Sequence, residues 1–139
     1  MKFIEAFLGR ALLVAALALC CARAQAAESS DLGQSAGVIT VPTGLSKAQI
    51  RDAIVAAFAG RQWGVTSKTD DRVVGYLKHR SNEATVTMIF DEQRVEMYCV
   101  GWQVHKTTGA REKPEQPKGW LNNLRADLTK HLNRTTSSK

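Results

Sequence analysis

Apolar residues between positions 46 and 60 recur every three or four residues, which is the spacing of one face of an α-helix. Ser46 lies where a helix N-cap belongs, and Gln49 completes an S-x-x-Q capping box. Gly60 provides a stop at the other end. We therefore predict a helix that begins after Ser46 and ends near Gly60.

From Trp63 onward the apolar period changes to two, which is typical of strands with one buried face. Short polar segments rich in turn-forming residues separate four such stretches. Because these connections are too short for crossovers, the strands should pair as an antiparallel meander. The predicted strands cover residues 62–67, 72–79, 84–90 and 94–102.

A second helical stripe closes the chain, and the later strands have one strongly apolar face and one mixed face, as in a sheet that helices cover on one side. The stripe consists of Trp120, Leu121, Leu124, Leu128 and Leu132. Both helices need the same apolar sheet face. The predicted fold class is therefore α+β, a two-layer sandwich in which a four-stranded antiparallel meander carries N- and C-terminal helices on one face.

The remaining segments lack a periodic pattern. Residues 27–44 are small, polar and Gly-rich and are expected to form a flexible lead, although 38–41 has the pattern of a short edge strand. The polar connection 103–118 is expected to be an exposed, mobile loop. This leaves an α+β domain over 45–133 and a disordered tail over 134–139.

The N-terminus has the pattern of an export signal. A positively charged start precedes the uninterrupted apolar run 11–19, which is too short to span a bilayer. Ala24 and Ala26 supply the small residues that signal peptidase requires. We predict a signal peptide over 1–26, cleaved after Ala26, and a periplasmic or secreted domain.

Cys20 and Cys21 at the end of the apolar run leave an alternative open. Leu17-Ala18-Leu19-Cys20 resembles a lipobox, in which Cys20 would be lipidated and kept as a membrane anchor. A lipidated cysteine normally follows a small residue, and here it follows Leu19. In this alternative the protein is a membrane-anchored lipoprotein, and it contacts the membrane only if lipidated.

Length and charge narrow the class of protein. The 139 residues allow one domain, and 44% hydrophobic with 23% charged residues is an ordinary globular composition. Signal removal takes away three positive charges (Lys2, Arg10, Arg23) and one negative charge (Glu5), so the formal net charge falls from +6 to +4. A modest positive charge favours contact with anionic envelope material, whereas nucleic acid is a poor partner for an exported domain.

Cys99 is the one cysteine of the predicted mature chain, so the sequence predicts no intramolecular disulfide. It is also the one candidate nucleophile, with His79 and His105 as candidate bases. Its apolar neighbours Val95 and Met97 favour the alternative of a buried, inert thiol.

Other reactive groups show no matched spacing. His79, His105 and His131 are scattered, without any recognised metal motif. Asp70 and Asp71 lie in a predicted hairpin and are interpreted as turn-formers. No catalytic residue, metal site or cofactor is predicted.

The candidate binding site lies on the open face of the predicted sheet. It combines positive charge with aromatic surface, which suits contact with glycan, phospholipid or protein. Its residues are Tyr76, Lys78, Arg80, Tyr98 and Trp102. The alternative is an ordinary solvated sheet face.

Three stretches together resemble small uncharacterised exported proteins and lipoproteins of bacteria: G-R-Q-W-G-V from Gly60, V-G-Y-L from Val74 and W-L-N-N-L from Trp120. The resemblance covers about residues 46–132. It differs at Lys118-Gly119, where the family usually has a tyrosine. It implies a fold and carries over no catalytic residue.

We therefore expect a non-enzymatic exported binding or accessory module that contacts an envelope component or a protein through its open sheet face. One alternative is an inhibitor or immunity-type protein against a lytic enzyme, which fits the size, charge and compartment. The other is a small thiol enzyme that uses Cys99.

Overall fold

The computed structural model of the protein describes residues 31–138. The chain divides into two units, 1–33 and 34–139, and the description below concerns the second. The predicted signal peptide (1–26) and the possible lipidation site Cys20 lie outside the described residues. In chain order the elements are β1 (Gln34–Thr40), α2 (Lys47–Gly60), β2 (Gly64–Lys68), β3 (Arg72–His79), β4 (Asn82–Phe90), β5 (Arg94–Val104), β6 (Arg111–Pro114) and α3 (Lys118–Ser137).

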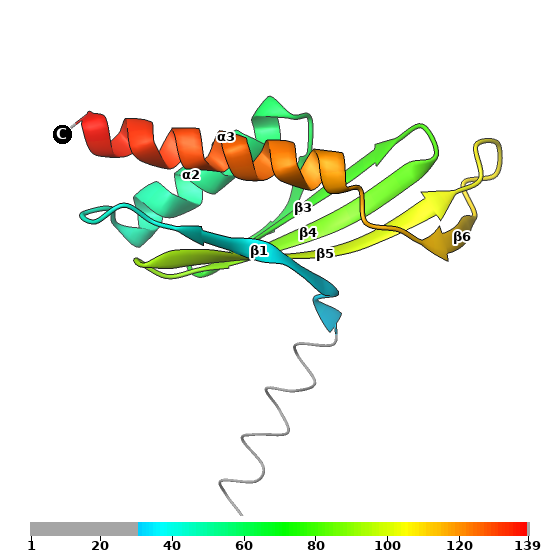
Figure 1. Ribbon diagram of the computed structural model, residues 1–139, viewed down its shortest axis with the longest axis horizontal. Coiled ribbons are helices and arrows are strands. Elements are labelled where there is room, and N and C mark those ends of the chain that lie inside the picture. Colours follow the sequence, from blue (N-terminus) through cyan, green and yellow to red (C-terminus); the bar gives the residue numbers. More distant parts are fainter. Residues whose placement is uncertain (1–30, 139) are drawn as a thin grey trace, which may run out of the picture. The chain divides into compact units, whose positions relative to one another are not determined.

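The strands form one antiparallel sheet, and both helices lie on the same side of it (Figure 1). The strand order is β1-β5-β4-β3-β2, and β6 also pairs with β5. This confirms an α+β fold with an antiparallel sheet and two helices. The predicted number of strands was wrong, since residues 31–138 contain six strands rather than four.

The first additional strand, β1, lies in the segment that was predicted to be a flexible lead. It pairs with β5 from Gln34 opposite Cys99 to Thr40 opposite Arg94. The edge-strand alternative over 38–41 overlaps the end of β1, whereas the flexible lead was wrong for 34–40. Most of β1 was missed because Ile39 is its one buried side chain, so the strand has almost no alternating pattern. Backbone pairing with β5 stabilises β1 in place of buried side chains, because the edge of β5 would otherwise leave its N–H and C=O groups unpaired.

A side chain from within α3 holds β1 in place. Arg125 Nη2 donates a hydrogen bond to the carbonyl oxygen of Ala36. The neighbouring Gly37 has a φ of 114°, and a Cβ at this position would lie 2.1 Å from Arg125 Nη2. The absence of a side chain at Gly37 thus makes room for the guanidinium that joins β1 to α3.

The second additional strand replaces the mobile loop predicted over 103–118. β5 continues to Val104, and after a turn β6 pairs back onto it, with Val104 opposite Arg111 and Trp102 opposite Pro114. Val104 is 1% exposed, yet it is not part of the main core cluster. The burial of Val104, at the end of β5, and the backbone pairing with β6 explain why this polar segment forms a hairpin.

The predicted disordered tail over 134–139 is also corrected, because α3 extends to Ser137. Hydroxyl groups in its last turns donate to backbone carbonyls one turn earlier, as in Thr135 to His131 at 2.9 Å and Thr136 to Leu132 at 3.0 Å. These bonds satisfy side chains that otherwise compete with a helix for backbone partners.

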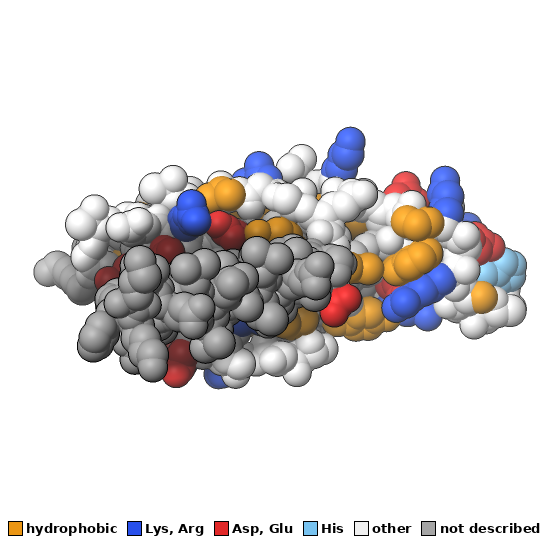
Figure 2. Space-filling model, turned by 90° about the horizontal axis from the view of Figure 1, so that it is seen from below, with side chains coloured by type: hydrophobic (Ala, Val, Ile, Leu, Met, Phe, Trp, Pro, Cys, Tyr) orange, Lys and Arg blue, Asp and Glu red, His pale blue; other side chains and the backbone are white. Residues whose placement is uncertain are grey.

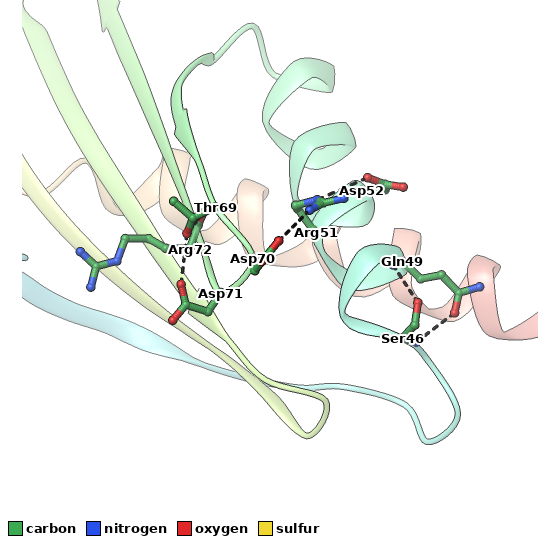
Figure 3. Close-up of polar contacts among 8 residues, drawn as sticks. All are labelled: Ser46, Gln49, Arg51, Asp52, Thr69, Asp70, Asp71 and Arg72. Carbon is green, nitrogen blue, oxygen red and sulfur yellow. Dashed lines mark hydrogen bonds and ion pairs between the residues drawn. The ribbon is translucent and has the colours of Figure 1, made fainter.

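The predicted start of α2 is confirmed in atomic detail (Figure 3). Ser46 Oγ accepts from the Gln49 N–H at 3.2 Å, and Gln49 Oε1 accepts from the Ser46 N–H at 3.0 Å. In the same view, Arg51 Nη1 lies 3.5 Å from Asp70 Oδ1, which ties α2 to the turn between β2 and β3.

The end of α2 is a Schellman motif rather than a simple glycine stop. The Trp63 N–H bonds the Phe58 carbonyl at 3.0 Å, and the Gln62 N–H bonds the Ala59 carbonyl at 3.1 Å. Gln62 takes the left-handed position with a φ of 63°. The motif turns Trp63 back onto Phe58, with ring centroids 5.8 Å apart.

The core lies between the two helices and one face of the sheet. From α2 it takes Ile50, Ala53, Ile54, Ala57 and Phe58, and from α3 it takes Leu121, Leu124, Leu128 and Leu132. Alternate residues of the central strands contribute Val73, Ala84, Val86, Met88, Phe90, Val95, Met97 and Cys99, and Ile39, Val41, Leu45 and Trp63 complete the core. Within residues 31–138, no helix lies on the opposite face of the sheet. Within residues 31–138, no helix is long and apolar enough to cross a membrane.

Candidate binding surface on the open sheet face

Strand register brings part of the predicted site together on the open face. Lys78 pairs with Glu83 across β3 and β4, and Glu83 pairs with Trp102 across β4 and β5. Tyr76 lies one row away on the same face, since residues two apart on a strand share a face. Seen from below the sheet (Figure 2), hydrophobic side chains lie beside basic and acidic ones on the part of this face that is not drawn in grey.

Glu83 is the centre of this group, although it was not among the site residues predicted from the sequence. It is only 8% exposed, and both of its carboxylate oxygens accept hydrogen bonds. The Tyr76 hydroxyl donates to Oε2 at 3.0 Å, and Arg111 Nε donates to Oε1. The bond from Arg111 holds the pKa of Glu83 below its usual range, and burial opposes this effect only in part. Glu83 is therefore ionised at neutral pH, and both of its carboxylate oxygens accept hydrogen bonds from protein side chains.

Arg111 is the second residue of this group that was not predicted from the sequence. Its guanidinium carbon lies 5.4 Å from the centroid of the Trp102 ring, within the range of a cation–π contact. The Arg111 side chain is nevertheless 57% exposed. One arginine thus joins the buried carboxylate of Glu83 to an aromatic surface and still faces solvent.

The Tyr76 hydroxyl is fixed as a hydrogen-bond donor. Its pKa is raised above the ordinary value, first by burial and then by the bond to Glu83. A neutral phenol that donates to a carboxylate is held in one orientation by that bond. Its ring is half-buried and lies on the same sheet face as Trp102, with β4 and its Glu83 between them.

Lys78 lies against the β5–β6 hairpin. A Cβ at Gly109 would lie 2.9 Å from Lys78 Nζ, so the ammonium group reaches the hairpin turn. Among the described ion pairs of residues 31–138, none involves Lys78. We call Tyr76, Lys78, Glu83, Trp102 and Arg111 the Glu83 cluster. It carries two positive charges and one negative charge.

The other two predicted residues lie outside this cluster. Tyr98 is four residues from Trp102 along β5, about 13 Å away at strand spacing. Its hydroxyl donates to Glu96 Oε2 at 3.0 Å, and Glu96 Oε1 lies 3.1 Å from Arg94 Nη2. Arg80 occupies the turn between β3 and β4, where it is exposed and has a φ of 56°.

No protein-family model, no curated protein and no solved structure matches the chain. The resemblance to small exported proteins and lipoproteins of bacteria therefore stays a prediction. The function has to be argued from the chemistry of the surface itself.

Cys99 lies on the opposite, helix-facing side of the sheet. It is 1% exposed, and burial raises the pKa of its thiol to about 11. Neither candidate base adjoins it. His79 lies in register with Gln103, four residues along β5, and His105 Nδ1 accepts the backbone N–H groups of Thr107 and Thr108, each at 3.3 Å. This setting favours the inert thiol over the nucleophile.

The carboxylates of the β2–β3 turn have structural contacts (Figure 3). The Thr69 hydroxyl donates to Asp71 Oδ1 at 3.1 Å, and Asp70 faces Arg51 of α2. Throughout residues 31–138, no group of three or more His, Cys, Asp and Glu side chains is placed to hold a metal ion.

Proposed function

We propose that the mature protein is a non-enzymatic exported binding module, and that its Glu83 cluster contacts an anionic component of the cell envelope. The observation that carries this proposal is the arrangement of Arg111, stacked on Trp102 and held by Glu83 while more than half of its side chain faces solvent. A cation fixed on an aromatic surface suits an anionic group that is attached to an apolar or ring-shaped body.

Preorganisation supports the same conclusion. Glu83 accepts from both Tyr76 and Arg111, so the two side chains are held before a ligand arrives. Binding therefore costs less side-chain entropy than it would on a surface of free lysines. The buried carboxylate thus positions the cation and does not itself act as the binding group.

Charge supports an anionic partner. The cluster carries one more positive than negative charge, and Lys78 has no ion-pair partner among the described ones of residues 31–138. Arg80 and Lys106 lie in the two neighbouring hairpin turns and extend the positive field. Export rests on the predicted signal peptide, and anchoring through Cys20 is the alternative, in which the surface would work close to a membrane.

Cosedimentation tests the proposal. The purified protein is mixed with vesicles of zwitterionic lipid, with vesicles that contain phosphatidylglycerol, and with an anionic polysaccharide on beads. We expect binding to at least one anionic material and not to zwitterionic vesicles, with an affinity that falls as salt is raised from about 0.05 to 0.3 M.

Two double variants of equal charge test the location. Lys78→Gln with Arg111→Gln should lower the affinity at least about tenfold, whereas Lys47→Gln with Lys130→Gln, on the helices, should lower it less than about threefold. Equal losses in both would show unspecific charge attraction and contradict the proposed site. Binding to no anionic material, with tight binding to a lytic enzyme instead, would favour the inhibitor alternative.

A further inference from the structure

A hollow of about 220 Å³ lies at the other side of the sheet, where the end of α2 and the start of α3 meet β3. It is separate from the Glu83 cluster, because it lies on the helix-bearing side. Its lining residues are Arg61, Gln62, Trp63, Leu77, His79, Trp120 and Asn123.

The apolar part of the hollow consists of two indole rings and Leu77. The rings of Trp63 and Trp120 meet edge to face, with centroids 6.1 Å apart and an interplanar angle of 89°. Trp63 is 4% exposed, whereas Trp120 and Leu77 are half-buried. The Schellman motif at the end of α2 places Trp63 here, so this apolar surface is rigid.

The rim consists of neutral polar groups that are free to bind. Gln62, His79 and Asn123 are exposed, and their side chains take part in none of the described hydrogen bonds of residues 31–138. The one permanent charge at the rim, Arg61, is already used: its Nε lies 2.6 Å and its Nη2 3.4 Å from the two carboxylate oxygens of Asp127. Two amides and an imidazole therefore offer both donors and acceptors around an apolar floor.

Size and chemistry together select the ligand class. The hollow is smaller than the roughly 300–1,000 Å³ of pockets that hold drug-sized molecules, so it suits one ring rather than an extended ligand. An anionic ligand would gain little here, because Asp127 pairs with Arg61 and, within residues 31–138, the hollow is lined by no second lysine or arginine, unlike the Glu83 cluster with its unpaired Lys78. A purely apolar ligand would leave the amides unused. A neutral sugar ring has an apolar C–H face for the indole rings and hydroxyl groups for the amides and the imidazole.

We infer that the hollow between Trp63 and Trp120 binds a single neutral sugar ring, such as one hexose unit of a glycan. Gln62 and Asn123 would bond its hydroxyl groups, and Trp120 and Leu77 would contact its C–H face. This site does not depend on the Glu83 cluster, so either can fail while the other holds.

Nuclear magnetic resonance on the full chain tests the site, with glucose, galactose and N-acetylglucosamine as separate probes. At least one sugar should shift the indole N–H signals of Trp63 and Trp120 saturably, with a Kd on the order of 1 mM. The Trp102 indole, on the other sheet face, should not move. Asn123→Ala and Gln62→Ala, both exposed positions, should each weaken binding roughly fivefold. Asn122→Ala, which removes an exposed amide of α3 that does not line the hollow, is the matched control and should leave the affinity unchanged.

Three results would overturn the inference. One is the absence of saturation by all three sugars at concentrations on the order of 100 mM. Another is saturation by indole or phenol but by none of the sugars, which would mark a pocket for an aromatic side chain. The third is full sugar affinity in the Asn123→Ala, Gln62→Ala double variant.

Discussion

Gly75 of β3 lies directly under the ring of Phe58 of α2. A Cβ at Gly75 would be 2.5 Å from Phe58 Cε1 and 2.6 Å from Cδ1. Phe58 is fully buried, so its ring has no solvent to move into. The missing side chain in the strand thus sets how closely α2 approaches the sheet.

Gly75→Ala should therefore destabilise the protein. Overpacking a filled core costs about 1–3 kcal/mol, because the added carbon forces the ring or the strand to shift. Gly60→Ala is the matched control, since a Cβ at Gly60 meets nothing within 4 Å and alanine favours the helix. Urea unfolding measures both; equal stability of the two variants would contradict the packing described.

The Glu83 cluster should make folding stability depend on pH. The pKa of Glu83 is lowered in the folded protein, chiefly by the bond from Arg111. The stabilisation is thus present above the unfolded pKa of about 4.3 and is lost as the pH falls through the lower folded value. Glu83→Gln should cost about 1–2 kcal/mol at pH 7, and this difference from the wild type should shrink below about pH 4.

Glu92→Gln serves as the control for this pH dependence, because Glu92 is an exposed residue of the β4–β5 turn. It should follow the wild-type stability curve at every pH. If Glu83→Gln were instead as far below the wild type at pH 3 as at pH 7, the loss would come from packing and not from the ionised carboxylate.

Attachment of β1 should depend on Arg125. Arg125→Ala removes the hydrogen bond to the Ala36 carbonyl, so the backbone amides of β1 should exchange hydrogen about fivefold to tenfold faster. Amides of the central strand β4 should keep their rates. Arg134→Ala, an exposed arginine in the last turn of α3, is the control, and identical β1 exchange in the two variants would show that Arg125 does not hold the strand.

Cys99 should resist thiol reagents in the folded protein. Its burial and its pKa of about 11 leave almost no accessible thiolate at pH 8. A maleimide probe should label the native protein at least about a hundredfold more slowly than the protein in urea. Rapid labelling of the native protein would contradict the inert thiol and support the alternative of a small thiol enzyme that uses Cys99.

The sequence predicted the elements whose side chains alternate clearly between buried and exposed. Helix α2 with its capping box and the strands β3 to β5 follow from such patterns, whereas all five residues of β2 are exposed. β6 and the first part of β1 were not predicted, because each strand is held mainly by backbone bonds to β5 and has few or no buried side chains. A pattern of side chains cannot reveal a strand whose partner edge stabilises it.

The sequence also predicted part of the Glu83 cluster. Alternation alone placed Tyr76, Lys78 and Trp102 on the open face, and register then brought them together. Alternation could not predict the contact between Glu83 and Arg111, because the β5–β6 hairpin brings these two residues together from 28 positions apart in the sequence. The Thr107-Thr108-Gly109 stretch before Arg111 is a hairpin signal that could have suggested this contact.

The Trp102 indole signal gives the most direct test of the Glu83 cluster. In a titration with phosphatidylglycerol vesicles and with an anionic polysaccharide, this resonance should shift or broaden with at least one of them. It should stay unchanged with zwitterionic vesicles and in the Lys78→Gln, Arg111→Gln variant. A Trp102 signal that does not respond to either anionic material, or that responds equally in the variant, would contradict binding at this surface.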